Sequence, residues 1–201
     1  MDLVTIRHLR QLPFIFGTVV ALGLAGCTDS SPSPDPASDG AEASSEEAST
    51  SDVQPALAVD TLPEVARGTG EQCPYLDTQF VANTNGQRVL DQGVDTRFDP
   101  PACVFWSYGD KPQVLVSVRH NENEAIARQV VDWAAPVDVT EPAEQPAGFQ
   151  GGRGSLGASG IEGYSVYAVA KGTTSVVVFS DQEQTIKPES IAESVISNLG
   201  L

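Results

Sequence analysis

Few residues in this sequence have the type and setting for acid–base or nucleophilic chemistry. The 201-residue chain has two histidines, and only His120 lies outside its first ten residues. A hydrolase of the Ser-His-Asp type would therefore need His120 as its base, with Ser155 or Ser159 as nucleophile. Neither serine has glycine at both the −2 and +2 positions, so the nucleophile elbow is absent. We interpret His120 as a partly exposed turn histidine and keep hydrolysis through it as an alternative.

A glycine-rich stretch, Gly152 to Gly157, matches the G-x-G-x-x-G pattern of dinucleotide-binding sites. In such sites the pattern leaves a strand and enters a helix whose N-terminus holds the pyrophosphate. Here it leaves a proline-rich loop and enters an expected strand, and no P-loop Lys-Ser/Thr follows. We therefore expect a mobile glycine loop and predict no cofactor.

Two groups of side chains have the residue types that ligate metals. The first group is His120, Glu122 and Glu124. Its two glutamates are explained better as charges in the first turn of a helix. The second group is Asp91, Asp95 and Asp99, which recur at intervals of four but lack the Asp/Asn/Gly spacing of an EF-hand. We predict no metal site at either.

The three cysteines differ in their surroundings. Cys27 ends the stretch Leu24-Ala25-Gly26-Cys27, which resembles the lipobox of bacterial lipoproteins, whose cysteine takes a diacylglycerol thioether and becomes the mature N-terminus. Cys73 and Cys103 remain as a pair, which suits a disulfide in an oxidising compartment. Two thiolates without other ligands make no closed zinc site, and no Cys-x-x-Cys motif is present.

Residues 1–26 have the parts of an export signal. Two arginines precede an apolar run from Leu12 to Leu24, which is too short for the roughly 20 residues that span a bilayer. We predict a lipoprotein signal peptide, with Cys27 carrying acyl chains of the palmitate type. Two acyl chains anchor a protein stably, so the expected location is extracytoplasmic, on the outer face of the cytoplasmic membrane.

Residues 27–60 have the composition of a disordered spacer. From Thr28 to Asp60 the chain has eight Asp/Glu, eight Ser, four Pro and no Lys or Arg. Such a segment buries too little apolar surface to offset the entropy of ordering it. Residues 61–201 suffice for a single globular domain. This domain has nine basic and eighteen acidic residues, a net charge of −9, which argues against nucleic acid as a partner.

The periodicity of residues 61–201 predicts an α+β domain. We expect a first helix between Thr61 and Gly70, a second that ends at Asn85-Gly86, a third that starts near Asn121 and a last one from Pro188. Residues 136–160 are expected to form a long loop. The predicted strands are Arg88–Val94, Ala102–Tyr108, Gln113–Arg119, Ile161–Ala170 and Ser175–Ser180, the last of them central. The main order β-β-β-α-β-β-α predicts an antiparallel sheet of about five strands with helices packed on one face and one disulfide.

Aromatic residues offer a candidate binding surface. Trp106 and Tyr108 share one face of a predicted strand, and Trp133 of the following helix is the natural packing partner. Packing in the hydrophobic core is the preferred explanation for the aromatic residues on this strand face. If the face is open instead, with Tyr164 or Tyr167 beside it, it forms an aromatic patch for a ligand or partner, rimmed by residues 136–160.

Several segments resemble a family of uncharacterised secreted lipoproteins from corynebacteria and related actinobacteria. They are CPYLDTQFVANTNGQRV, DPPACVFWSY, VVDWAAP, TTSVVVFSDQEQ and SVISNLGL. The resemblance covers residues 61–201 and implies a domain of unknown function with a PsbP-like α/β/α or α+β sandwich. It implies no activity and no catalytic residues.

The function expected from these observations is binding without catalysis. The membrane would be contacted through the lipid on Cys27, and an envelope protein or glycolipid is the expected partner. The alternatives are a lipid or glycolipid carrier with an internal cavity, and an envelope hydrolase that uses His120.

Overall fold

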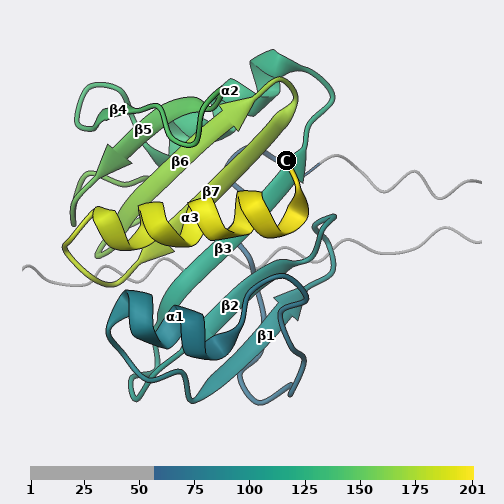
Figure 1. Ribbon diagram of the computed structural model, residues 1–201, viewed down its shortest axis with the longest axis vertical. Helices are drawn as coiled ribbons and strands as arrows, with labels where there is room; N and C mark the ends of the chain where they lie inside the picture. The colour runs from purple at the N-terminus through teal and green to yellow at the C-terminus, as the bar shows by residue number, and fades with distance from the viewer. Residues whose placement is uncertain (1–56) are drawn as a thin grey trace, which may run out of the picture. The chain divides into compact units, whose positions relative to one another are not determined.

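The computed structural model describes residues 57–201. The predicted signal peptide, Cys27 and most of the predicted tether lie outside the described residues. Within these residues no helix is both long and apolar enough to cross a membrane. The described part consists of one antiparallel sheet with helices on both of its faces (Figure 1).

Seven strands form the sheet, in the spatial order β1-β2-β3-β7-β6-β5-β4. Their bounds are β1 Asp91–Asp95, β2 Ala102–Trp106, β3 Pro112–His120, β4 Glu141–Ala143, β5 Gln150–Gly154, β6 Ser165–Lys171 and β7 Thr174–Ser180. The prediction of about five strands was therefore too low. The two additional strands, β4 and β5, lie in the segment predicted as a loop. They were not predicted because β5 has three glycines and β4 has Pro142, so neither shows the alternation of apolar and polar residues that is typical of a strand.

Strands β3 and β7 form the centre of the sheet and pair antiparallel from Val114↔Ser180 to His120↔Thr174. The prediction that residues 175–180 form a central strand is confirmed, since β7 is fourth of the seven. Alternate side chains of these strands point to opposite faces. Val176 and Val178 belong to one core cluster, whereas Val177 and Phe179 belong to the other.

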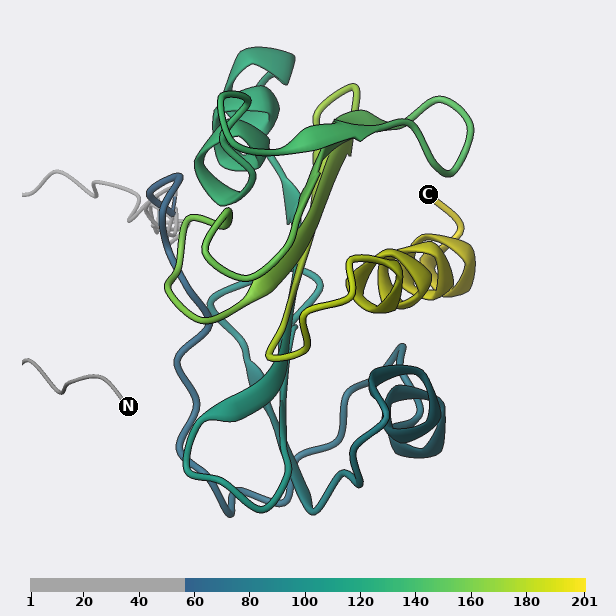
Figure 2. The same ribbon diagram turned by 90° about the vertical axis from the view of Figure 1, so that its left-hand side faces the viewer.

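Three helices cover the sheet: α1 Thr78–Asn85, α2 Glu124–Ala134 and α3 Ile186–Leu199. Helices α1 and α3 lie on one face and α2 lies on the other (Figure 2). The prediction that the helices pack on one face was wrong. The central strands are apolar on both faces, so each face must be covered.

The helix ends follow the expected chemistry. Asp77 accepts hydrogen bonds from the first-turn amides of α1, and Gly86 ends that helix in the left-handed conformation at φ 79°. Asn123 caps α2 by accepting from the Ile126 amide. Gly200 ends α3 at φ 67°. Side-chain acceptors explain where α1 and α2 begin, and glycine past the end explains where α1 and α3 stop.

No helix forms between Thr61 and Gly70, so that prediction was wrong. Residues 57–70, which we call the strap, have neither helix nor strand structure and lie on the same side of the sheet as α2 (Figure 2). Val59, Leu62 and Val65 pack against the core on this side. The strap thus covers β1–β3, while α2 covers β5–β7.

The predicted disulfide is confirmed. Cys73 and Cys103 are joined with an S–S distance of 2.04 Å and close a loop with a sequence separation of 30. The bond connects the segment before α1 to strand β2. Because Cys103 is fully buried, the disulfide holds this segment directly on the core.

Candidate functional site

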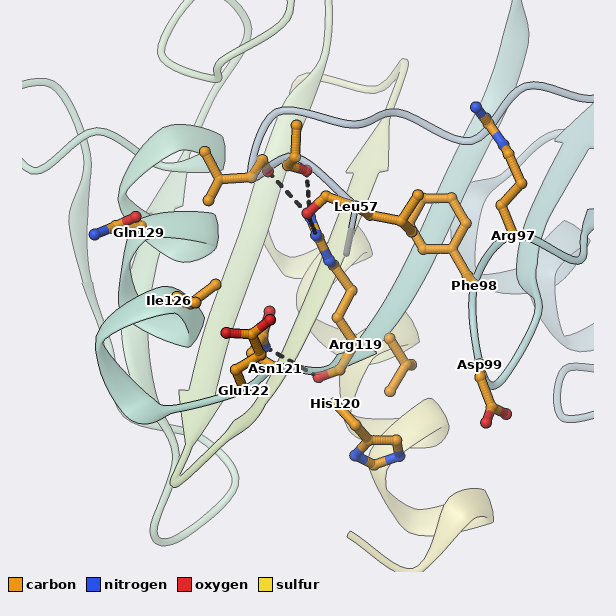
Figure 3. A pocket seen from close by; sticks show the side chains of 13 residues that line it. Leu57, Arg97, Phe98, Asp99, Arg119, His120, Asn121, Glu122, Ile126 and Gln129 are labelled. Atoms are coloured by element: carbon orange, nitrogen blue, oxygen red, sulfur yellow. Dashed lines mark hydrogen bonds between the residues drawn. The ribbon is translucent and has the colours of Figure 1, made fainter. Parts of the chain in front are cut away.

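A pocket of about 400 Å³, which we call the strap pocket, lies beside the start of the strap (Figure 3). Its walls come from four segments that are distant in sequence. These are the start of the strap at residues 57–59, the loop at residues 97–99, the end of β3 with the turn into α2 at residues 118–122, and Ile126 and Gln129 of α2.

Arg119 fixes the first wall. It lies near the end of β3 and is 8% exposed. Its guanidinium donates to the carbonyl oxygens of Leu57 at 2.5 Å, Ala58 at 2.9 Å and Val59 at 3.2 Å. Among the described residues no carboxylate forms an ion pair with it. Burial lowers the pKa of Arg119, and the charge of Asp60 acts in the opposite direction. Arg119 is thus a buried cation held by neutral carbonyl groups.

Arg97 and Asp95 fix the second wall, the loop between β1 and β2. Arg97 donates to Asp95 at 2.6 Å and to the carbonyl of Leu62 in the strap at 3.1 Å. The main-chain N–H of Glu64 also donates to Asp95, at 2.8 Å. Burial of Asp95 would raise its pKa, but the hydrogen bonds and the charge of Arg97 outweigh burial and lower the pKa.

A third attachment lies further along the strap. Arg67 donates to the carbonyls of Ser107 at 2.7 Å and Gly109 at 2.8 Å, next to the end of β2. Strand β1 has glycine where the strap crosses it, because a Cβ on Gly93 would lie 2.4 Å from Val65 Cγ1. The strap is thus attached to the sheet at residues 57–59, 62–64 and 67. These attachments hold its start, which is one wall of the pocket, in position before any ligand binds.

The structure does not bring His120 together with Ser155, Ser159 or a carboxylate. Its Nδ1 lies 3.2 Å from the Thr174 hydroxyl, and the ring points away from Arg119 (Figure 3). Ser159 donates instead to the carbonyls of Ile161 and Tyr164. In the described part of the chain, no serine or carboxylate hydrogen-bonds to His120.

The glycine motif and the candidate metal ligands have structural explanations. Gly152 and Gly154 lie within β5 and not at a helix N-terminus, and a Cβ on Gly152 would come within 2.9 Å of Thr140 Oγ1. No three His, Cys, Asp or Glu side chains gather as metal ligands anywhere in residues 57–201. Asp91 and Asp95 hold the strap, since Asp91 accepts from the Gly68 amide at 2.6 Å.

The four aromatic residues proposed as a surface do not form one. Trp106 and Tyr164 are 4% and 5% exposed and lie in the core on the face of the sheet that α2 and the strap cover. Tyr167 is fully buried in the core on the opposite face, where its hydroxyl donates to the Gln145 carbonyl at 2.6 Å and burial raises its pKa to about 12. Only Tyr108 is open to solvent, at 77%. The placement of these residues agrees with the core explanation, in which Trp106 and Trp133 contribute to the same cluster.

Comparison with known families matches residues 57–201 to a family described as Domain of unknown function (DUF2020). The chain belongs to the DUF2020 family. A search of curated proteins finds no match for it. The DUF2020 region begins at Leu57, the first residue whose carbonyl Arg119 holds. The strap, including its start, is therefore part of the DUF2020 domain.

The strap and the role of Arg119 were not predicted from the sequence. Leu57 to Asp60 fall within the segment that composition assigned to the tether, yet Val59 packs on the core and Arg119 holds the adjacent carbonyls. The available signal was the recurrence of Leu57, Val59 and Leu62 after a long stretch almost without large apolar residues. No sequence signal identified which arginine would hold them.

Proposed function

We propose that this DUF2020 protein is a secreted lipoprotein of the actinobacterial type, anchored through Cys27, whose domain binds a small ligand in the strap pocket without catalysing a reaction. We further infer that its three layers correspond to a PsbP-like sandwich. The proposal for the anchor rests on the lipobox-like sequence Leu24 to Cys27 after a short apolar run.

The observation that carries the binding role is the strap pocket itself. Its volume of about 400 Å³ lies within the range of about 300–1,000 Å³ typical of small-molecule sites. Its lining combines apolar side chains, such as Leu57 and Ile126, with polar and charged ones in similar number, such as Gln129 and Glu122. The hydrogen bonds of Arg119 and Arg97 hold two of its walls. A preformed pocket suits binding, because little ordering is needed when the ligand enters.

The two alternatives receive less support. The predicted hydrolase needs a serine or carboxylate in hydrogen-bonding reach of His120, whereas the described side chain that contacts the His120 ring is that of Thr174. A carrier needs a sheet wrapped around a space. Here the sheet has two edges, β1 and β4, and each face carries a core of packed side chains.

Native mass spectrometry of the oxidised protein, purified from the envelope of an actinobacterial host, tests the binding role. Ile126→Trp should fill the pocket, because Ile126 lines it. Ala125→Trp is the matched control, since Ala125 is exposed on the same helix and does not line the pocket. We expect a bound mass on the wild-type protein and on Ala125→Trp, and its loss from Ile126→Trp. An apo mass for all three proteins would contradict the binding role.

The anchor is tested separately by replacing Cys27. Cys27→Ser should abolish incorporation of labelled palmitate and release the protein from the membrane fraction. The Cys73→Ser, Cys103→Ser double variant serves as the control, because both cysteines are held in the disulfide and should not affect lipid incorporation. Membrane association of Cys27→Ser equal to that of the wild type would contradict the anchor.

A further inference from the structure

A second hollow lies at the edge of the sheet away from β1. It has a volume of about 390 Å³ and lies between α2, the loop after it, and the β4–β5 hairpin. We call it the edge groove. Its floor is apolar and partly main chain, since Val131, Ala135 and Ala143 are 2–4% exposed and Gly151 and Gly152 contribute no side chains.

The glycines of the floor are required by close packing. A Cβ on Gly151 would lie 1.9 Å from the carbonyl oxygen of Ala168 in β6, and a Cβ on Gly152 would lie 3.0 Å from the Ala135 Cβ. A side chain at either position would therefore displace its neighbours. Main chain is exposed to the groove at these two positions, so an extended chain can approach it closely.

The rim of the edge groove is acidic. Asp132 of α2 and Glu144 after β4 are exposed, and neither forms an ion pair with another described residue. Glu141 also lines the groove and pairs with Arg153 at 3.2 Å. Arg128 is the one cation among the lining residues. The charges of the rim favour a cationic occupant.

An exposed apolar side chain stands beside these carboxylates. Val137 lines the groove and is 76% exposed, and Val139 in the same loop is 60% exposed. Pro142 in β4 has no N–H to donate across the open edge of the sheet. An occupant would therefore be recognised through side chains more than by extension of the sheet.

We propose that the edge groove docks an extended basic segment of a partner protein, in which Lys or Arg alternates with small apolar residues. The cationic side chains pair with Asp132 and Glu144, and an apolar side chain packs on Val137. This proposal does not rest on ligand binding in the strap pocket, because the two hollows share no lining residue.

Fluorescence anisotropy of the full chain with a labelled peptide Val-Lys-Val-Lys-Val tests the proposal. The control peptide has Glu in place of each Lys. The double variant Asp132→Asn, Glu144→Gln should weaken binding roughly tenfold, and Val137→Ser should weaken it severalfold. The double variant Glu162→Gln, Glu183→Gln removes two exposed charges outside the groove and should bind as the wild type does. The affinity should fall as salt is added.

Three results would overturn the proposal. One is the absence of binding to the wild-type protein at millimolar peptide. Another is equal affinity for the Lys and Glu peptides. The third is equal weakening by the two double variants, which would mean that the net negative charge of the domain, and not the edge groove, attracts the peptide. All substituted side chains are exposed, so the variants should fold.

Discussion

Arg119 is the residue whose replacement tests the strap most sharply. Arg119→Met keeps the approximate length of the side chain but removes its donors, so the carbonyls of Leu57, Ala58 and Val59 lose their partners. Arg119→Lys keeps the charge, but a single ammonium cannot reproduce the planar fork of the guanidinium. We expect both variants to loosen the start of the strap, and Met to do so more strongly.

The expected magnitude follows from the three hydrogen bonds. A hydrogen bond with a charged partner contributes about 1.5–3 kcal/mol, but freed carbonyls near the surface regain hydrogen bonds to water. We therefore expect Arg119→Met to lower the free energy of unfolding by about 2–4 kcal/mol, part of it from weaker packing of Val59. For a domain of this size, that corresponds to a fall in Tm of about 5–12 °C.

Urea unfolding followed by tryptophan fluorescence measures this loss, because Trp106 and Trp133 both belong to the core beneath the strap and α2. Hydrogen exchange of residues 57–66 should accelerate in Arg119→Met before exchange in β3 and β7 does. Arg128→Met, on the exposed surface of α2, is the control and should change stability by less than about 0.5 kcal/mol. If Arg119→Met and Arg128→Met had the same free energy of unfolding, the role assigned to Arg119 would be refuted.

Three further predictions concern the rest of the domain. Replacing both Cys73 and Cys103 by serine should lower the free energy of unfolding by about 3–4 kcal/mol in urea titrations, since the disulfide closes a loop with a sequence separation of 30. Asn85 is fully buried, donates to Gln113 at 3.0 Å and accepts from Ser180 at 2.6 Å, so Asn85→Leu should cost about 2–4 kcal/mol in the same assay. The pKa of Asp95 is lowered in the folded state, so its ionised form stabilises the fold above the unfolded pKa of about 3.9, and this contribution disappears as the pH falls through the lower folded value. The stability difference between the wild type and Asp95→Asn should therefore shrink on acidification from about pH 6, and a difference independent of pH would contradict the ion pair with Arg97.

Patterns within a segment predicted the elements whose own residues show the alternation or the pairing. The alternation of Val114, Val116 and Val118 predicted β3 and the face that these residues bury. The doubly apolar run Val176–Phe179 predicted a central strand, although it also implied a cover on each face, which we did not infer. The pairing of Cys73 with Cys103 followed from the count of cysteines.

Elements whose own residues lack such a pattern were missed. Strand β5 contains three glycines and is a strand because β6 pairs with it from Gln150↔Ala170 to Gly154↔Val166. The strap is held by Arg119, which lies about 60 positions away in the sequence from the carbonyls that it binds. Tyr164 lies just before β6 and Tyr167 lies within it, and their side chains point to opposite faces of the sheet. Residue type alone does not determine which face a side chain takes, because that depends on the register of the strand. Such contacts appear only once the chain is folded.

Amide NMR spectra of the isotope-labelled protein test the central claim, ligand binding in the strap pocket, most directly. One spectrum is recorded on the protein as purified from the envelope, and a second after bound material has been extracted. We predict that the shifted signals belong to residues 57–59, 97–99 and 118–122, and to Ile126 and Gln129, which line the pocket. Identical spectra, or shifts confined to other parts of residues 57–201, would contradict the account.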